Sequence, residues 1–90
     1  MDKPNLYVIA RFLDILYSHG NPISKTRLQM LSGLNYPRFV EYLEWLLQHD
    51  LITIIKDEEG VERVSLSSKG IESYYRLVGW IREFMANIKI

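Results

Sequence analysis

The chain has 90 residues, 48% of them hydrophobic, and its 11 Lys and Arg balance its 11 Asp and Glu. This length fits one domain with a modest core, so the large apolar content suggests that a second copy covers part of the surface. The absence of cysteine excludes disulfides, thiolate metal sites and cysteine nucleophiles. The chain lacks the pattern of a signal peptide and any apolar run of the roughly 18 residues that span a bilayer, so we expect a soluble, cytoplasmic protein.

Residues from about 5 to 18 are predicted to form the first helix. Apolar residues recur on one face at helical spacing, namely Leu6, Ile9, Ala10, Leu13, Leu16 and Tyr17. Val8, Phe12 and Ile15 lie toward the opposite side, and a helix that is apolar on two sides packs between two layers. The sequence His-Gly-Asn-Pro over residues 19–22 then ends the helix.

Two helices separated by only a few residues are expected next. Ile23 is predicted to be briefly extended, and Ser24 is a suitable N-cap for a short helix over 25–31, which Ser32 and Gly33 end. This close succession of helices is typical of a helix-turn-helix.

The third predicted helix is capped by Asn35 and carries Pro37 in its first turn, where the missing N–H costs little. It is expected to run to about His49. Its inward face is predicted to consist of Phe39, Leu43, Leu46 and Leu47.

A β-hairpin and a final helix complete the predicted order. Residues 51–56 and 61–66 have the composition and alternation of strands, and an acidic turn over 57–60 joins them. Ser67 and Ser68 open the last helix. The order therefore predicts a mainly α winged helix-turn-helix fold, with residues 1–90 as one domain, 5–66 as its core and 68–90 as a C-terminal dimerisation helix.

Four segments resemble the small archaeal winged-helix proteins, and together they cover nearly the whole chain. They are Ile-Ser-Lys-Thr-Arg-Leu at 23–28, Leu-Asn-Tyr at 34–36, Tyr-Leu-Glu-Trp-Leu-Leu at 42–47 and Leu-Ser-Ser-Lys-Gly at 66–70. The resemblance implies double-stranded DNA as a partner. It also implies a homodimer built on an antiparallel pair of last helices, in a transcriptional regulator or a nucleoid-associated architectural protein.

Eight residues are candidate DNA contacts. The second helix of the motif enters the major groove by its N-terminal part, where an Arg can read guanine and an Asn can read adenine. The preceding helix start and the hairpin stems meet phosphates. The candidates are therefore Lys25, Thr26, Arg27, Asn35, Tyr36, Arg38, Lys56 and Arg63.

Several of these residues also have a structural interpretation. Asn35 is more often a helix cap than a base reader, and Tyr36 can instead close the edge of the core. Acidic side chains oppose strong DNA binding, on the third helix at Glu41 and Glu44 and at the wing tip over 57–59. Trp45 is either an exposed interface anchor or a packing residue.

The last helix carries an apolar stripe with 3-4-3-4-3 spacing, which is typical of a helix seam. We predict it as the dimer interface, with the alternative that it packs on the first helix of its own chain. Gly79 is interpreted as a weak point that permits a close helix crossing. The stripe consists of Ile71, Tyr74, Val78, Ile81, Met85 and Ile88.

No enzyme, metal or cofactor site is predicted. His19 and His49 lie far apart in the sequence without a triad or ligand arrangement, and there is no glycine-rich phosphate loop. The leading hypothesis is a homodimeric DNA-binding protein, and the alternative is a protein-interaction module that uses Trp45 and the acidic wing. A third hypothesis is ligand sensing at a dimer interface.

Overall fold

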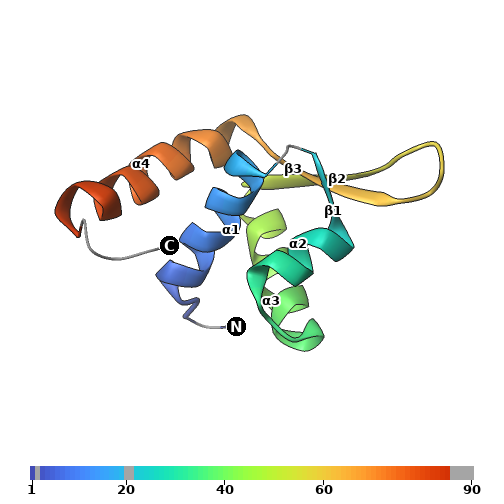
Figure 1. Cartoon of the computed structure of the whole chain (residues 1–90), viewed down its shortest axis with the longest axis horizontal. Coiled ribbons are helices and arrows are strands. Elements are labelled where there is room, and N and C mark those ends of the chain that lie inside the picture. The colour runs from blue at the N-terminus through green and yellow to red at the C-terminus, as the bar shows by residue number, and fades with distance from the viewer. Residues whose placement is uncertain (2, 20–21, 86–90) are drawn as a thin grey trace.

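The computed structural model describes residues 1, 3–19 and 22–85, and its elements follow the predicted order. They are α1 (Leu6–Ser18), β1 (Ile23–Ser24), α2 (Lys25–Ser32), α3 (Tyr36–Gln48), β2 (Ile52–Lys56), β3 (Glu62–Leu66) and α4 (Ser68–Phe84). Figure 1 shows α1 near the middle of the molecule, α4 toward one end of the long axis and the hairpin loop at the other. The predicted architecture of three helices, a hairpin and a final helix is confirmed.

The helix starts are fixed by capping side chains. The side-chain oxygens of Ser24, Asn35 and Ser67 accept hydrogen bonds from the third backbone N–H of their helices, at 3.2, 3.0 and 2.9 Å. Asn5 caps α1 in the same manner and therefore precedes the helix that was predicted to include it. Each cap stabilises its helix by about 1 kcal/mol. Gly33, with φ of 72°, supplies the left-handed residue that ends α2.

The hairpin belongs to a three-stranded antiparallel sheet in the order β1-β3-β2. Ile23 was predicted to be extended, and it pairs with Val64 in the central strand. Ile52 pairs with Leu66 on the other side. These four side chains are buried, so the short strand β1 ties the start of α2 to the stem of the wing.

The core surrounds α1, whose buried residues lie on both predicted faces, as at Ile9 and Phe12. Leu6 and Tyr17, which were assigned to a buried face, are instead exposed because they lie at the two ends of the helix. On α3 the prediction of Leu47 as an inward residue is wrong, since it is 36% exposed while Tyr42 is 1% exposed. Tyr42 is accommodated because its ring stacks on Phe12 and its hydroxyl accepts a hydrogen bond from the backbone N–H of Asn5 at 3.0 Å.

The start of α4 is locked onto the beginning of β2. The backbone N–H of Ser67 donates to the carbonyl of Leu51 at 3.0 Å, and its hydroxyl donates to the carbonyl of Asp50. Gly70 faces the same segment so closely that a Cβ there would collide with the Leu51 carbonyl oxygen. The Ser-Ser-Lys-Gly segment therefore has a packing role that fixes the direction in which α4 leaves the sheet.

Helices α1 and α4 pack against each other in an antiparallel arrangement. Tyr17 near the end of α1 stacks on Tyr74 near the start of α4, with ring centroids 4.2 Å apart. The Tyr74 hydroxyl and Arg82 both donate to Oδ1 of Asp14, at 3.2 and 3.1 Å. Burial, followed by the nearby Asp14 carboxylate, raises the pKa of Tyr74. These hydrogen bonds connect α4 to Asp14 of α1 along one side of the helix pair.

Candidate nucleic-acid interface

The first turn of α3 presents Tyr36 and Arg38 to solvent. The opposite side of the helix anchors it in the core through residues such as Phe39 and Tyr42. Arg38 lies over the Tyr42 ring, 5.6 Å from its centre, and makes no ion pair with any residue the structure describes. Its guanidinium donors are therefore available for an acceptor outside the chain.

At this turn, a structural interpretation was considered for Asn35 and for Tyr36, and the structure agrees with it only for Asn35. Asn35 is a helix cap, because its Oδ1 accepts from the backbone N–H of Arg38. That bond occupies the side-chain oxygen and leaves the amide NH₂ exposed. Tyr36 does not close the core edge, since its side chain is exposed. Thus Tyr36 and Arg38 are the more accessible pair of the three candidates on this turn.

The start of α2 lies beside the stem of the hairpin. Ser24 pairs directly with Arg63 across the sheet, and the Nζ of Lys25 lies 3.9 Å from Oε1 of Glu62. Thr26 and Arg27 are exposed in the next positions. The structure therefore brings the candidate contacts of α2 and of the wing stem together, with one carboxylate among them.

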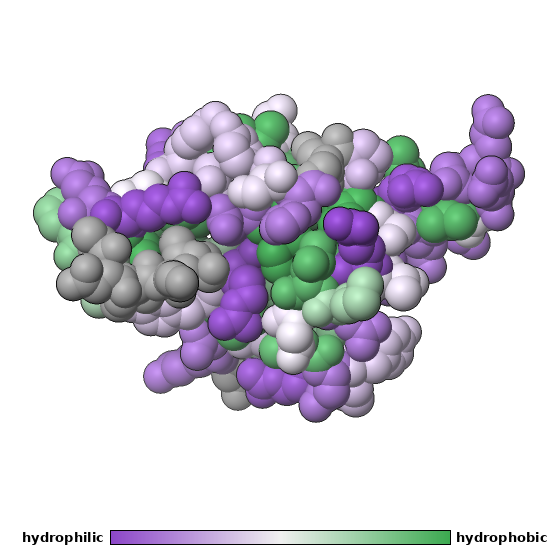
Figure 2. Space-filling view, in the orientation of Figure 1, coloured by the Kyte–Doolittle hydropathy of each residue, from purple (hydrophilic) through white to green (hydrophobic). Residues whose placement is uncertain are grey.

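The turn of the wing is organised by Asp57. Its Oδ1 accepts from the backbone N–H groups of Glu59 and Val61 at 2.9 and 3.0 Å, and its Oδ2 accepts from Nε of Arg63 at 3.0 Å. The hydrogen bond from Val61, followed by that from Arg63, lowers the pKa of Asp57. Figure 2 shows a mainly hydrophilic hairpin tip, which carries the remaining acids Glu58 and Glu59.

Two of the five candidate cations are paired within the chain and three are not. Lys25 lies near Glu62, and Arg63 is paired with Asp57. Arg27, Arg38 and Lys56 make no ion pair in the part of the chain that the structure describes. Sequence analysis missed both acidic partners. The hairpin register, which places Glu62 opposite Lys56, could have indicated the first of them.

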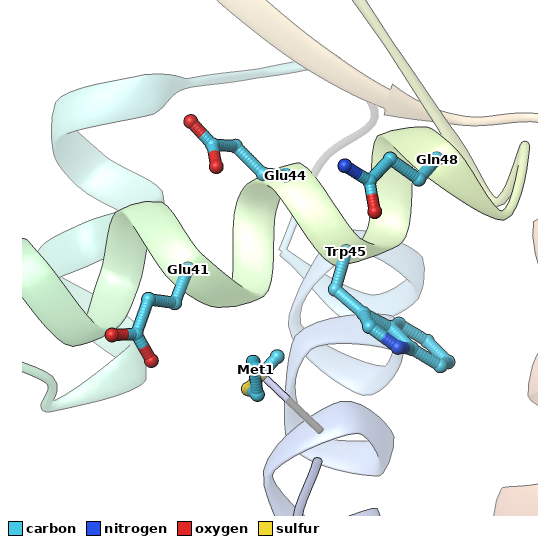
Figure 3. Close-up of a pocket in the computed structure, with 5 residues that line it drawn as sticks. All are labelled: Met1, Glu41, Glu44, Trp45 and Gln48. Atoms are coloured by element: carbon cyan, nitrogen blue, oxygen red, sulfur yellow. The ribbon is translucent and has the colours of Figure 1, made fainter. Parts of the chain in front are cut away.

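Further along α3, Trp45 is half-buried and stacks on His49 with ring centroids 3.9 Å apart. It lines a shallow hollow with Met1, Glu41, Glu44 and Gln48, and Figure 3 shows the ends of Met1 and Trp45 on the same side of the helix. Both interpretations of Trp45 are thus partly met. The residue packs against the core and leaves part of its ring exposed, while the side chains of Glu41 and Glu44 point away from the ring (Figure 3).

The apolar stripe of α4 lies mainly inside its own chain. Tyr74, Val78 and Ile81 are buried in the core, which is the packing on α1 considered as the alternative. Ile71 and Met85 are half-buried, and Ile88 lies outside the described residues. In this packing the three buried side chains have almost no surface left for a partner, so the seam prediction needs revision. Large apolar side chains are instead exposed elsewhere on α4, at Tyr75, Trp80 and Phe84.

No group of three or more His, Cys, Asp or Glu side chains in the described part of the chain is placed to hold a metal ion. Over residues 1, 3–19 and 22–85, no helix has the length and apolar character needed to cross a membrane.

No protein-family model matches the sequence, and no curated protein is matched by it. Solved structures share its fold. F93 from STIV, a winged-helix DNA-binding protein, has a TM-score of 0.83 and 14% identity, covering 97% of this chain and 100% of that one. Sso10a-2, a DNA-binding protein from Sulfolobus solfataricus, has a TM-score of 0.75 and 15% identity, covering 93% and 84%. MepR, a transcription regulator of the Staphylococcus aureus multidrug efflux pump MepA, has a TM-score of 0.78 and 15% identity, covering 94% of this chain and 62% of that one.

The TM-scores show that the chain shares the architecture of these structures, and this likeness allows each element to be named. Helices α2 and α3 form the helix-turn-helix, the β2–β3 hairpin is the wing, and α4 is the C-terminal helix that follows the wing. The chain has the winged-helix fold.

Proposed function

We propose that this protein binds double-stranded DNA, with the N-terminal turn of α3 in the major groove. The observation that carries the proposal is the exposed Arg38 on a helix whose other side is anchored in the core. A rigid helix presenting a free guanidinium fits a guanine edge, whose O6 and N7 accept two hydrogen bonds. Solved winged-helix proteins of the same fold are described as DNA-binding, and one MepR variant was solved bound to an oligodeoxyribonucleotide.

The remaining candidates position the protein on the phosphate backbone. Arg27 and Lys56 supply free charge, while Lys25 and Thr26 begin α2, whose N-terminal amides also attract phosphate. Arg63 donates from Nε to Asp57, which offsets part of its charge, and its terminal nitrogens can still donate to a phosphate. With so few free cations on a chain of zero net charge, we expect modest affinity that decreases as salt rises, with a slope set by the small number of phosphate contacts.

The test is binding to a mixed-sequence duplex at about 50 and 200 mM salt, a range over which phosphate-dominated affinity changes strongly. Arg38→Ala is expected to weaken binding about 5- to 150-fold, the usual value for an Arg that reads a base. Arg76→Ala is the matched control, because Arg76 is an exposed α4 arginine paired with Glu72 and far along the chain from the interface. Equal affinity of the Arg38 variant and the control would contradict the proposal.

We also propose that the protein acts as a homodimer, as a transcriptional regulator or an architectural protein of the nucleoid, and not as an enzyme. A dimer places two recognition helices on successive major grooves, which compensates for the weak contacts of one copy. Sequence preference separates the two roles. A regulator selects one site from a random pool, and an architectural protein binds all duplexes with similar affinity.

A protein-interaction module is the second candidate, and the hollow beside Trp45 favours it. Glu41 and Glu44 contribute to the lining of the hollow together with the partly exposed indole, and the wing tip is acidic as well. If no duplex binds even at the lower salt concentration, this candidate replaces DNA binding.

A further inference from the structure

A patch of exposed apolar side chains lies where the start of α1 meets α4. Trp80 and Phe84 are 56% and 64% exposed, with ring centroids 5.3 Å apart. Beside them is a hollow of about 120 Å³ lined only by uncharged residues. We define the α1/α4 patch as Leu6, Tyr7, Leu77, Trp80 and Phe84.

The patch is a second apolar stripe on α4, distinct from the one that packs on α1. Leu77, Trp80 and Phe84 are spaced three and four residues apart and therefore share one side of the helix. The core stripe of Tyr74, Val78 and Ile81 lies on the neighbouring side. A single exposed apolar residue is ordinary, but a contiguous set of large ones marks an interaction surface.

We propose that the α1/α4 patch is the surface on which a second copy of this chain docks about a two-fold axis. The inference rests on the dimer in the proposed function and assigns its interface to residues that the predicted seam did not contain. The Trp80 ring forms one wall of the apolar hollow, and the exposed Phe84 ring lies next to it on the same molecule. Two copies related by a two-fold axis can therefore each place Phe84 against the hollow of the other.

Charge and area also favour a copy of the same chain. The lining of the hollow carries no charged residue and the chain has zero net charge, so two copies approach without repulsion. Aromatic side chains bury about 150–250 Å² each, so the five partly exposed residues offer on the order of 500 Å². A stable interface needs about 800 Å² from each partner, so the dimer must also bury adjoining surface of α1 and α4.

The position of the patch leaves the DNA-binding surface free. Figure 1 shows α4 and the hairpin loop toward opposite ends of the long axis, with the start of α1 away from the hairpin. No candidate DNA contact from Lys25 to Arg63 belongs to the patch. Docking through the patch therefore keeps both recognition helices exposed.

The test is sedimentation equilibrium of the full chain over a range of concentrations. The Trp80→Lys/Phe84→Lys double variant is expected to raise the dimer dissociation constant at least about 100-fold, as the loss of two buried aromatic anchors does. Tyr75→Lys is the matched control, because Tyr75 is 57% exposed on the other flank of α4 and should leave the dimer intact. A monomeric wild type, or a double variant that still dimerises, would overturn the proposal.

A second measurement does not depend on the folding of the double variant. The chain has two Trp, so Trp45→Phe leaves Trp80 as the fluorescent probe. Its emission should shift to longer wavelength as the protein is diluted and the dimer dissociates. Constant emission across the dissociation measured by sedimentation would place the interface elsewhere.

Measuring DNA binding together with the oligomeric state distinguishes failure of this inference from failure of the proposed function. A monomeric wild type whose DNA binding depends on Arg38 would overturn the interface and keep the function. A dimer that depends on Trp80 and Phe84 but binds no duplex would support the interface and overturn the function. If both hold, the double variant should bind DNA more weakly than wild type and retain its dependence on Arg38.

Discussion

Replacement by alanine is predicted to have opposite effects on the stability of the protein at two glycines of α4, Gly70 and Gly79. At Gly79 an added Cβ meets no atom within 4 Å. Gly79→Ala should therefore stabilise the protein by about 0.8–1 kcal/mol, the difference in helix propensity between the two residues. At Gly70 the Cβ would collide with the Leu51 carbonyl oxygen and lie 3.1 Å from Cδ2 of Leu66.

The cost at Gly70 can be assembled from its contacts. Overpacking of this kind destabilises by about 1–3 kcal/mol. Displacing the Leu51 carbonyl also weakens its hydrogen bond from Ser67, which contributes about 1 kcal/mol. The gain in helix propensity offsets up to about 1 kcal/mol of this. The net expectation for Gly70→Ala is a loss of about 1–3 kcal/mol.

Urea unfolding followed by circular dichroism, at one protein concentration, measures both effects. A fixed concentration is needed because a dimer makes apparent stability depend on concentration. Stabilisation by Gly70→Ala would refute the reasoning about the α4 start. Destabilisation by Gly79→Ala would show that something outside the chain approaches Gly79 closely, as the interpretation of a helix crossing there requires.

Two further predictions concern charge. Glu62→Gln removes the carboxylate near Lys25 and opposite Lys56, so DNA affinity should rise about two- to five-fold. A filter-binding or anisotropy assay measures this change. Weaker binding by the variant would show that Glu62 has another role. The pKa values of Tyr74 and Tyr75 are raised above 10.0, by burial and by the hydrogen bond with Tyr17 respectively, so both should ionise at higher pH than a free tyrosine in an ultraviolet titration. Since the unfolded chain releases these protons first, the associated stability is present below about pH 10 and is lost above it. Constant stability through that range would contradict the assignment.

Local features of the fold could be predicted because local chemistry decides them. Ser24 and Asn35 are short polar residues before helical segments, and both are caps in the structure. Gly33 could be assigned to a helix end for a similar reason, since only glycine adopts positive φ without strain. The order of elements followed from these boundaries and from the change in apolar spacing at the hairpin.

Features that depend on how distant elements pack together were harder to predict from the sequence. Leu47 was expected on the inward face of α3, but Tyr42 is buried instead, where it contacts Phe12 and Asn5, which are far away in the sequence. The spacing of the α4 stripe predicts a face that packs on another helix, and Tyr74, Val78 and Ile81 are buried, but spacing alone does not tell whether the covering helix belongs to the same chain. Of the candidate site, the exposure of Arg38 was predicted, whereas the pairing of Arg63 with Asp57 depends on the wing turn.

The antiparallel pairing of α1 with α4 has a consequence for how the chain folds. Its contacts join residues far apart in the sequence, as in the hydrogen bonds from Tyr7 to Met85 and from Tyr74 to Asp14, which span 78 and 60 positions. Such long-range contacts slow folding because a large loop must close before they form. During synthesis α1 leaves the ribosome long before its partner helix, and its aromatic residue Tyr17 has no Tyr74 to stack on. Helix α1 should therefore reach its final stability only after translation has passed α4.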